Sequence, residues 1–404
     1  MRRSYAAVLA AVIVTAAGCT ADEKPAPATP VAESSTATPA ASVSTAWRAP
    51  VKVRQGVPWL WEYSDDVVVA GPRGLVALDR ESGAEVWRLP LGGPVCGTTR
   101  SPSEIGLVAV VVGRCAPTGG APTARRTTVK GIDLESASVV WERPFIGAPS
   151  LDVGGEVLLA TMECGARRID LTTGAALGRI DAACSDSVLA GQGVVIVRTP
   201  GDAGDLRDPV GWRVVDIATG ETRMAPTAPG RITAPTRVVS ADPLTVLAGS
   251  ARQNHPSLVR IDDQGVRLLA PLSIDSEEAF TAVDGDRLVM AAQDWTGVTV
   301  FNLEDGAIVR HVRYRDADEW IPIAIRDGAL LGIDGDPEGL SSGHGRLTTT
   351  NLDDNAVDIV GDLDGGNDYA VAGPKGVVFG DILLMPTRGN NGVVAHRLTL
   401  PSDE

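Results

Sequence analysis

The chain has 404 residues, of which 51 are acidic and 36 are basic, so its formal net charge is −15. This charge argues against a nucleic acid as partner and against broad electrostatic binding to an anionic lipid surface. The 45 glycines and 27 prolines are typical of many short strands and turns, and the length exceeds one ordinary compact core unless the chain forms a repeat or a barrel.

Residues 1–18 have the pattern of an export signal. Arg2 and Arg3 precede an apolar run from Tyr5 to Ala17, which is too short to span a membrane as a helix. The run ends in small residues followed by Cys19, and this pattern resembles a bacterial lipobox. The resemblance implies cleavage before Cys19, lipidation of its thiol, and an extracytoplasmic location in a bacterial cell envelope, anchored to the membrane by the lipid. Ordinary signal cleavage beside a chance cysteine is the alternative.

Residues 19–46 start at the lipidated cysteine and are rich in alanine, proline, threonine and serine. A segment of this composition cannot bury a core, so we expect a disordered tether. The folded domain is expected over residues 47–404, with residues 47–53 forming its first strand.

One stretch shows the unit from which this domain is built. Residues 74–78 are apolar and β-prone, Asp79 can accept bonds from following amides, and Gly83 tolerates a positive φ, so the chain reverses there. The returning strand carries Trp87, which can cover neighbouring apolar surface. Weakened copies recur to the C-terminus, with the aligned turn residue at Asp79, Asp133, Asp170, Asp216, Asp262, Asn302, Asn351 and Arg397. A spacing of about 45 residues is typical of one four-stranded propeller blade.

Eight copies predict an all-β, eight-bladed β-propeller of four-stranded antiparallel blades. The last copy supplies only three strands, so we expect residues 47–53 to complete the last blade, because closure removes the open sheet edges. The propeller is expected to be a monomer.

The pattern Ala-x-Asp-x-x-Ser-Gly-x-x-x-Trp over residues 77–87 resembles the tryptophan-docking motif of quinoprotein-type (PQQ-like) β-propellers. In that family the tryptophan packs between neighbouring blades. Several copies depart from the motif: Ala137 replaces the glycine, while Gly178 and Met224 stand at the tryptophan position. The resemblance implies blade-docking roles for Asp79, Gly83, Trp87, Asp133, Trp141, Asp170, Gly174, Asp216 and Gly220. The chain is also loosely similar to the propeller lipoprotein of the outer-membrane assembly machinery.

Four cysteines remain besides Cys19, and an even number in an exported chain predicts two disulfides. Cys96 is expected to start an inner strand and Cys115 to end the antiparallel neighbour, so the pairing 96–115 is preferred. That leaves Cys164 with Cys184. Metal ligation is the rival interpretation, but no Cys-x-x-Cys or Cys/His cluster supports it.

No catalytic constellation is present in the sequence. The four histidines fall in different units, and no nucleophile elbow, zinc-protease or phosphate-loop motif occurs. The acidic clusters lack the spacing of a calcium loop, so we expect no metal and no cofactor. Trp59, Trp61 and Tyr63 alternate on an expected inner strand, where they could stack a ligand in the central channel or, as we favour, pack between blades.

Three long loops, near residues 113–127, 198–211 and 333–345, are expected on one face together with the cysteines. Long loops on a rigid scaffold are where binding usually occurs. The residues on or beside them form the predicted binding face: Arg114, Arg125, Arg126, Asp202, Asp205, Trp212, Asp334, Asp336 and His344.

The function expected from these features is a lipid-anchored, non-catalytic scaffold that binds an envelope protein or a ligand. A quinone-dependent dehydrogenase is the alternative, and its family implies PQQ, calcium, a catalytic Asp and often a vicinal disulfide. No adjacent cysteine pair exists here, so no catalytic residue is carried over. A sugar- or peptide-binding propeller is the third possibility.

Overall fold

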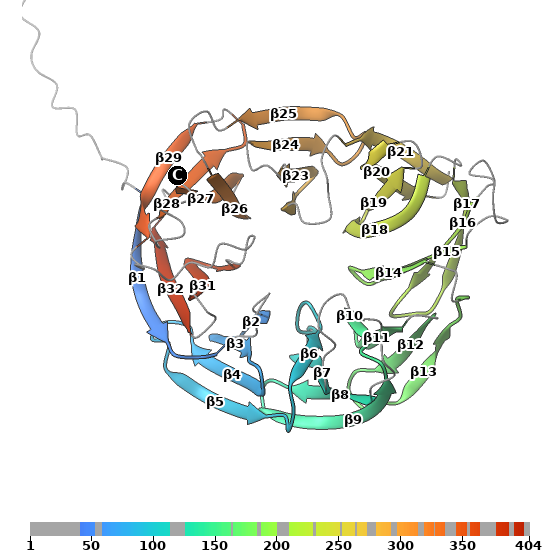
Figure 1. The fold of residues 1–404 in the computed structure, drawn as a ribbon, viewed down its shortest axis with the longest axis horizontal. Helices are drawn as coiled ribbons and strands as arrows, with labels where there is room; N and C mark the ends of the chain where they lie inside the picture. The colour runs from blue at the N-terminus through green and yellow to red at the C-terminus, as the bar shows by residue number, and fades with distance from the viewer. Residues whose placement is uncertain are drawn as a thin grey trace, which may run out of the picture. The chain divides into compact units, whose positions relative to one another are not determined.

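The computed structural model describes residues 41–52, 59–113, 126–162, 165–183, 187–199, 210–228, 232–250, 253–262, 265–272, 280–291, 297–313, 319–326, 328–335, 345–353, 356–363, 377–387 and 392–399. These residues form eight four-stranded antiparallel sheets, which follow one another around a ring (Figure 1). The predicted eight-bladed β-propeller is therefore confirmed.

The blades are numbered in chain order, each from its inner to its outer strand. Blade 1 contains β2 (Trp59–Tyr63), β3 (Asp66–Ala70), β4 (Gly74–Asp79) and β5 (Glu85–Pro90). Blade 2 contains β6 (Val95–Thr98), β7 (Leu107–Gly113), β8 (Arg126–Asp133) and β9 (Ser138–Ile146). Blade 3 contains β10 (Ser150–Gly154), β11 (Val157–Met162), β12 (Gly165–Asp170) and β13 (Ala176–Ile180). Blade 4 contains β14 (Ser187–Gly191), β15 (Val194–Thr199), β16 (Val210–Asp216) and β17 (Thr222–Ala228).

The second half of the ring repeats this order. Blade 5 contains β18 (Ile232–Ala241), β19 (Leu244–Ser250), β20 (Gln253–Asp262) and β21 (Gly265–Pro271). Blade 6 contains β22 (Thr281–Asp284), β23 (Arg287–Ala291), β24 (Gly297–Asn302) and β25 (Ile308–Arg313). Blade 7 contains β26 (Glu319–Arg326), β27 (Ala329–Gly335), β28 (Gly345–Asn351) and β29 (Val357–Leu363). Blade 8 contains β30 (Val377–Phe379), β31 (Ile382–Pro386), β32 (Val393–Thr399) and, as its outer strand, β1 (Ser42–Ala49).

The N-terminal strand closes the ring as expected, but its predicted bounds of 47–53 are wrong. β1 begins at Ser42, five residues earlier, and pairs antiparallel with β32 from Ser42↔Thr399 to Ala49↔Val393. The Ser- and Thr-rich composition predicted tether up to residue 46, yet Val43 packs into the apolar cluster between blades 7 and 8. Pro50 lacks a backbone N–H and follows the strand directly, which explains its early end.

The apolar core of the described residues lies between blades. Their eight apolar clusters each combine residues of two adjacent blades, one cluster for each interface around the ring. The second strand of each blade supplies much of this surface. In β3, for example, Val67, Val68 and Val69 are fully buried although their side chains alternate between the two faces of the sheet. Each blade is thus apolar on both faces and depends on both neighbours.

Among the described residues, no helix has the length and apolar character needed to cross a membrane.

Candidate functional site

The two ends of the third strand in each blade define two faces of the ring. The "turn face" carries the turns that follow Asp79, Asp133, Asp170 and Asp216, where the third strand connects to the outer strand. The "loop face" is the opposite one and carries the connections between second and third strands, such as residues 71–73 in blade 1. The predicted long loops begin and end on the loop face, but most of their residues lie outside the described ranges.

The turn after each aligned Asp is held by local hydrogen bonds. Asp79 Oδ1 accepts bonds from the Ser82 backbone N–H at 2.7 Å and from the Ser82 hydroxyl at 2.5 Å. The Gly83 N–H donates to the Asp79 carbonyl at 2.8 Å, and Gly83 has a φ of 68°. Because these bonds favour the carboxylate, the Ser82 hydroxyl and backbone N–H hold the pKa of Asp79 below its usual value.

Blade 3 repeats this turn geometry. Asp170 Oδ1 accepts bonds from the Thr173 backbone N–H at 2.7 Å and from its hydroxyl at 2.8 Å. These two bonds, the backbone one first, lower the pKa of Asp170. The Gly174 N–H donates to the Asp170 carbonyl at 2.8 Å, with a Gly174 φ of 69°. The turn therefore presents a bare glycine to the preceding blade.

Two tryptophans dock on such glycines. Trp141 of β9 donates its indole N–H to the Leu171 carbonyl of blade 3 at 2.6 Å, and a Cβ at Gly174 would lie 2.7 Å from Trp141 Cγ. Trp47 of β1 donates in the same way to the Arg80 carbonyl of blade 1 at 2.7 Å. A Cβ at Gly83 would lie 2.5 Å from the Trp47 ring. Trp47 is therefore the docking residue of the blade that closes the ring.

Two arginines bind the turn of the next blade at positions where no docking tryptophan is present. Arg168 of β12 donates from Nε to the Ile217 carbonyl at 2.8 Å and from a terminal nitrogen to the Ala218 carbonyl at 2.6 Å, both in the turn of blade 4. Arg260 of β20, which is 8% exposed, donates to the Leu303 carbonyl in the turn of blade 6. The sequence motif did not reveal these arginines, although both stand two residues before the aligned Asp.

Trp87 does not dock as deeply. It is only partly buried, in the apolar cluster between blades 1 and 2, whereas Trp47 and Trp141 are 6% and 8% exposed. The turn that follows Asp133 has Ala137 in place of the glycine, with a φ of 50°. Among the described residues, the Trp87 indole makes no hydrogen bond to this turn. A Cβ at the docking position explains the difference.

The predicted binding residues are only partly described. Outside the described ranges lie the lipidation site, three of the disulfide cysteines and six residues of the predicted binding face: Cys19, Cys115, Cys164, Cys184, Arg114, Arg125, Asp202, Asp205, Asp336 and His344. Arg126 begins β8 on the loop face and is exposed. Asp334 is near the loop-face end of β27, where the Arg346 guanidinium pairs with it at 2.8 Å.

The prediction that Trp212 belongs to the binding face is wrong. Trp212 is fully buried in the apolar cluster between blades 4 and 5, on the same face of β16 as the buried Val214. Side chains two residues apart on a strand share a face, so this alternation could have placed Trp212 in the core.

Two inner-strand aromatics also pack between blades, as favoured from the sequence. Trp61 is 2% exposed and donates its indole N–H to the Thr99 carbonyl of blade 2 at 3.1 Å. The Tyr63 ring lies against Gly106, where a Cβ would overlap it. Neither ring is therefore available to stack a ligand in the channel.

Charged side chains near the inner strands were missed by the sequence analysis. Asp152 of β10 is 7% exposed, and its burial raises its pKa, although a bond from the Val153 N–H and the charge of Arg100 oppose the rise. Burial lowers the pKa of Arg237 on β18, and Arg100 lowers it further. Arg100 thus acts electrostatically on inner strands of both blade 3 and blade 5.

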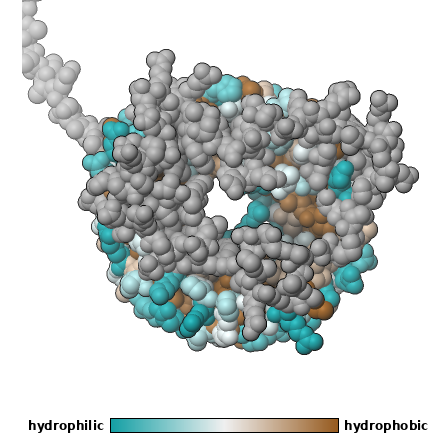
Figure 2. Space-filling model, in the orientation of Figure 1, coloured by the Kyte–Doolittle hydropathy of each residue, from teal (hydrophilic) through white to brown (hydrophobic). Residues whose placement is uncertain are grey.

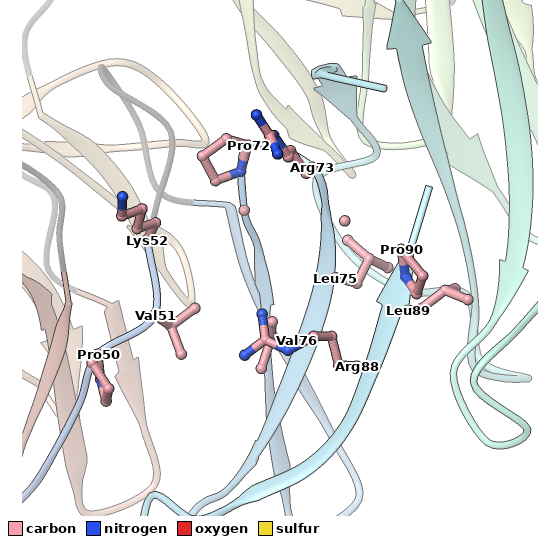
Figure 3. Close-up of a pocket in the computed structure, with 12 residues that line it drawn as sticks. Pro50, Val51, Lys52, Pro72, Arg73, Leu75, Val76, Arg88, Leu89 and Pro90 are labelled. Carbon is pink, nitrogen blue, oxygen red and sulfur yellow. The ribbon is translucent and has the colours of Figure 1, made fainter. Parts of the chain in front are cut away.

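Three grooves lie between adjacent blades: two include loop-face connections, and the third runs along the third and outer strands of blade 3 as far as the residues beside the Asp170 turn. The groove between blades 8 and 1 has a volume of about 680 Å³ and that between blades 1 and 2 about 620 Å³. The groove between blades 2 and 3 has about 550 Å³. Figure 3 shows the first of them, with Pro50, Val51 and Lys52 after β1 on one side and Val76 and Leu89 of blade 1 on the other. A separate opening is visible at the centre of the ring (Figure 2).

Within the described residues, no three His, Cys, Asp or Glu side chains are grouped so that they could hold a metal ion. PQQ would need a stacking platform beside a calcium site. Trp61 and Tyr63 of β2 pack against a neighbouring blade and do not supply such a platform.

No family model matches the chain, and no curated protein matches its sequence. Solved structures do match it. A chain from a crystal structure of the eukaryotic initiation factor aligns with a TM-score of 0.50 and 11% identity, covering 86% of this chain and 87% of that one. A chain of hydrazine synthase from Kuenenia stuttgartiensis gives a TM-score of 0.41 and 12% identity, covering 77% and 97%. At such identities the first likeness concerns the fold alone. The class defined by the fold is an eight-bladed β-propeller.

Proposed function

We propose that this protein is a lipid-anchored propeller of the bacterial cell envelope that acts as a non-catalytic binding scaffold. The observation that carries the proposal is the row of open grooves between adjacent blades of a closed ring, two of which include loop-face connections. A rigid ring holds such surfaces in fixed geometry, which lowers the entropy lost on binding. Repeat scaffolds commonly present their binding loops on one face.

The anchor is proposed from the sequence. The signal-like residues 1–18, the small residues before Cys19 and the tether composition after it together support lipidation of this cysteine. The Cys19→Ala variant should move from the membrane fraction to the soluble fraction and lose incorporation of labelled fatty acid. A variant that stays membrane-bound and labelled would contradict the anchor.

The disulfides remain part of the proposal as well. Cys96 Sγ lies 3.2 Å from the carbonyl oxygen of Gly113, two residues before Cys115 in the sequence. β6 and β7 pair antiparallel here, with Val95 opposite Val112. This proximity supports the pairing of Cys96 with Cys115 and leaves Cys164 for Cys184. Mass spectrometry of non-reduced peptides from the exported protein tests both pairs.

The scaffold role is tested by site-specific crosslinking in intact cells. A photo-crosslinking residue replaces the exposed Arg126 on the loop face, and the matched control replaces the exposed Glu304 on the turn face. The proposal expects a discrete crosslinked product at position 126 that is absent at position 304 and weaker with Cys19→Ala. Equal products at both positions, or none at position 126, would contradict loop-face binding.

The second candidate, a quinone-dependent dehydrogenase, rests on the likeness of residues 77–87 to the quinoprotein motif. It is tested by adding PQQ with calcium to the purified chain and measuring alcohol or sugar oxidation. Turnover of either substrate above the level without protein would contradict the non-catalytic scaffold and support the dehydrogenase. A sugar or peptide ligand remains compatible with the scaffold.

A further inference from the structure

The three grooves between adjacent blades contain equivalent cross-strand pairs that differ in charge. Each pair joins the third strand to the outer strand, three residues before the aligned Asp. It is Val76 opposite Arg88 in blade 1, Lys130 opposite Glu142 in blade 2, and Arg167 opposite Arg179 in blade 3. The pair in blade 2 is neutralised by an ion pair of 2.9 Å between Lys130 Nζ and Glu142.

The pair in blade 3 places two like charges directly opposite each other. Such a pair destabilises a sheet, whereas opposite charges stabilise it. Arg143 of blade 2 lines the same groove, so three arginines converge in a chain whose net charge is −15. Among the described residues, Asp181 is the counter-charge of this group, 3.5 Å from Arg179 Nε, and both of these side chains are well exposed. Within the described part of the chain, no acidic residue lines the groove itself.

The floor of this groove is apolar. Phe145 and Ile169 are 4% and 2% exposed, and Leu177 is 46% exposed at the rim. The Arg167 guanidinium lies over the Phe145 ring, 5.6 Å from its centroid, and this cation–π contact helps to fix its position.

The opposite face of blade 3 also departs from the docking motif. In blade 2, Trp141 lies over Gly131, and a Cβ at position 131 would overlap the indole. In blade 3, Gly178 stands at the tryptophan position opposite Arg168, which docks toward blade 4 instead. A Cβ at Gly178 would meet nothing within 4 Å. Gly178 and Arg168 lie on the face of blade 3 that is turned toward blade 4, whereas Arg167 and Arg179 lie on the face turned toward blade 2.

We infer that the groove between blades 2 and 3 binds a ligand with two adjacent oxyanion groups beside a small apolar part. Guanidinium forks match the oxygens of phosphate and carboxylate, and two arginines from paired strands can each take one group. Arg143 adds charge from the other wall, and Leu177 provides an apolar contact. This inference names a ligand class for the proposed scaffold and rests on that role, but the solution test below needs neither a membrane nor a partner.

The test measures binding of inorganic pyrophosphate and of citrate to the full-length chain in detergent at low ionic strength, by calorimetry and by the shift in melting temperature. Binding of pyrophosphate but not citrate would identify the ligand groups as phosphates, and binding of citrate but not pyrophosphate would identify them as carboxylates. Binding of both probes would support a site that accepts either kind of oxyanion. The affinity should fall steeply as salt is added. Absence of binding for both probes at millimolar concentration would overturn the inference while leaving the membrane crosslinking result unaffected.

Arg179→Glu is the decisive variant. It converts the like-charge pair into the arrangement of Lys130 and Glu142, so the unliganded chain should melt at a higher temperature than the parent at low salt. Its affinity for the anion should fall at least tenfold. Lys130→Ala in the neighbouring groove is the control and should bind as the parent does. Retained binding in Arg179→Glu, or equal loss in Lys130→Ala, would overturn the inference.

Discussion

Blade 3 contacts its two neighbouring blades through different kinds of side-chain interaction. Toward blade 2 it offers Gly174, on which Trp141 rests with a single hydrogen bond and a large buried ring. Toward blade 4 it extends Arg168, which makes two hydrogen bonds to turn carbonyls and is only partly buried. Both devices reach the residue after the aligned Asp. The first depends mainly on burial of apolar area and the second on charge-assisted hydrogen bonds, so they should respond differently to mutation.

The largest effect is expected for Trp141→Ala. Removing a buried ring of this size costs about 3–5 kcal/mol of unfolding free energy, because a cavity remains between the blades. Denaturant unfolding of the full-length chain in detergent measures it. Trp87→Ala is the matched control and should cost clearly less, since Trp87 is only partly buried. Equal losses of unfolding free energy in the two variants would mean that the burial of the tryptophan does not determine its contribution to stability.

Gly174→Ala should follow, at about 2–4 kcal/mol. The φ of 69° strains any residue with a Cβ, and this Cβ would also press on Trp141 at 2.7 Å. Gly285→Ala is the control, since Gly285 has a φ of 57° and open space for a Cβ. The difference between the two losses measures the docking contact. Indistinguishable losses would assign the whole effect to backbone strain.

Arg168→Met should destabilise by about 1.5–3 kcal/mol, because a charge-assisted pair of hydrogen bonds is lost while the apolar stem is kept. Arg167→Met, the adjacent residue on the other face, removes no hydrogen bond to a turn and relieves the like-charge pair with Arg179, so it should destabilise clearly less. Arg168→Lys should not restore the parent, since an ammonium cannot reproduce the fork. Full rescue by lysine would show that charge alone matters.

Ala137→Gly should stabilise the chain by about 1 kcal/mol, because glycine relieves the positive φ and lets Trp87 approach the turn. The fluorescence of Trp87 should shift to shorter wavelength as it becomes more buried, and Trp87→Ala should remove this shift. A destabilised Ala137→Gly variant would exclude this account of the weaker docking.

The smallest expected effect is the loss of stability at low pH that comes from protonation of the turn aspartates. The pKa values of Asp79 and Asp170 are lowered in the folded chain, so their contribution is fully present above the unfolded pKa of about 4 and is lost as pH falls through the folded pKa. Asp170→Asn should therefore flatten the dependence of the melting temperature on pH below about 4. An unchanged slope would contradict the role of the Thr173 bonds.

The local sequence pattern was sufficient to predict the blades but not the contacts between them. The aligned Asp residues end the third strands of blades 1 to 5 as predicted, because turn chemistry depends on neighbouring residues. The docking arginines Arg168 and Arg260 could not be predicted from the motif, since their partners are carbonyls 43 to 50 residues away. Trp47 could have been found, because the expected outer strand of blade 8 is where the motif places its tryptophan.

The sequence by itself determined the number of blades, the antiparallel order and the closure of the ring by the N-terminal strand, because strand periodicity and turn residues repeat along the chain. Only the tertiary structure decided that β1 starts at Ser42, that Trp212 is core, and that blade 3 leaves an arginine-lined groove. These outcomes depend on which side chains meet across blades, and the energy of such contacts is set by packing between segments distant in sequence.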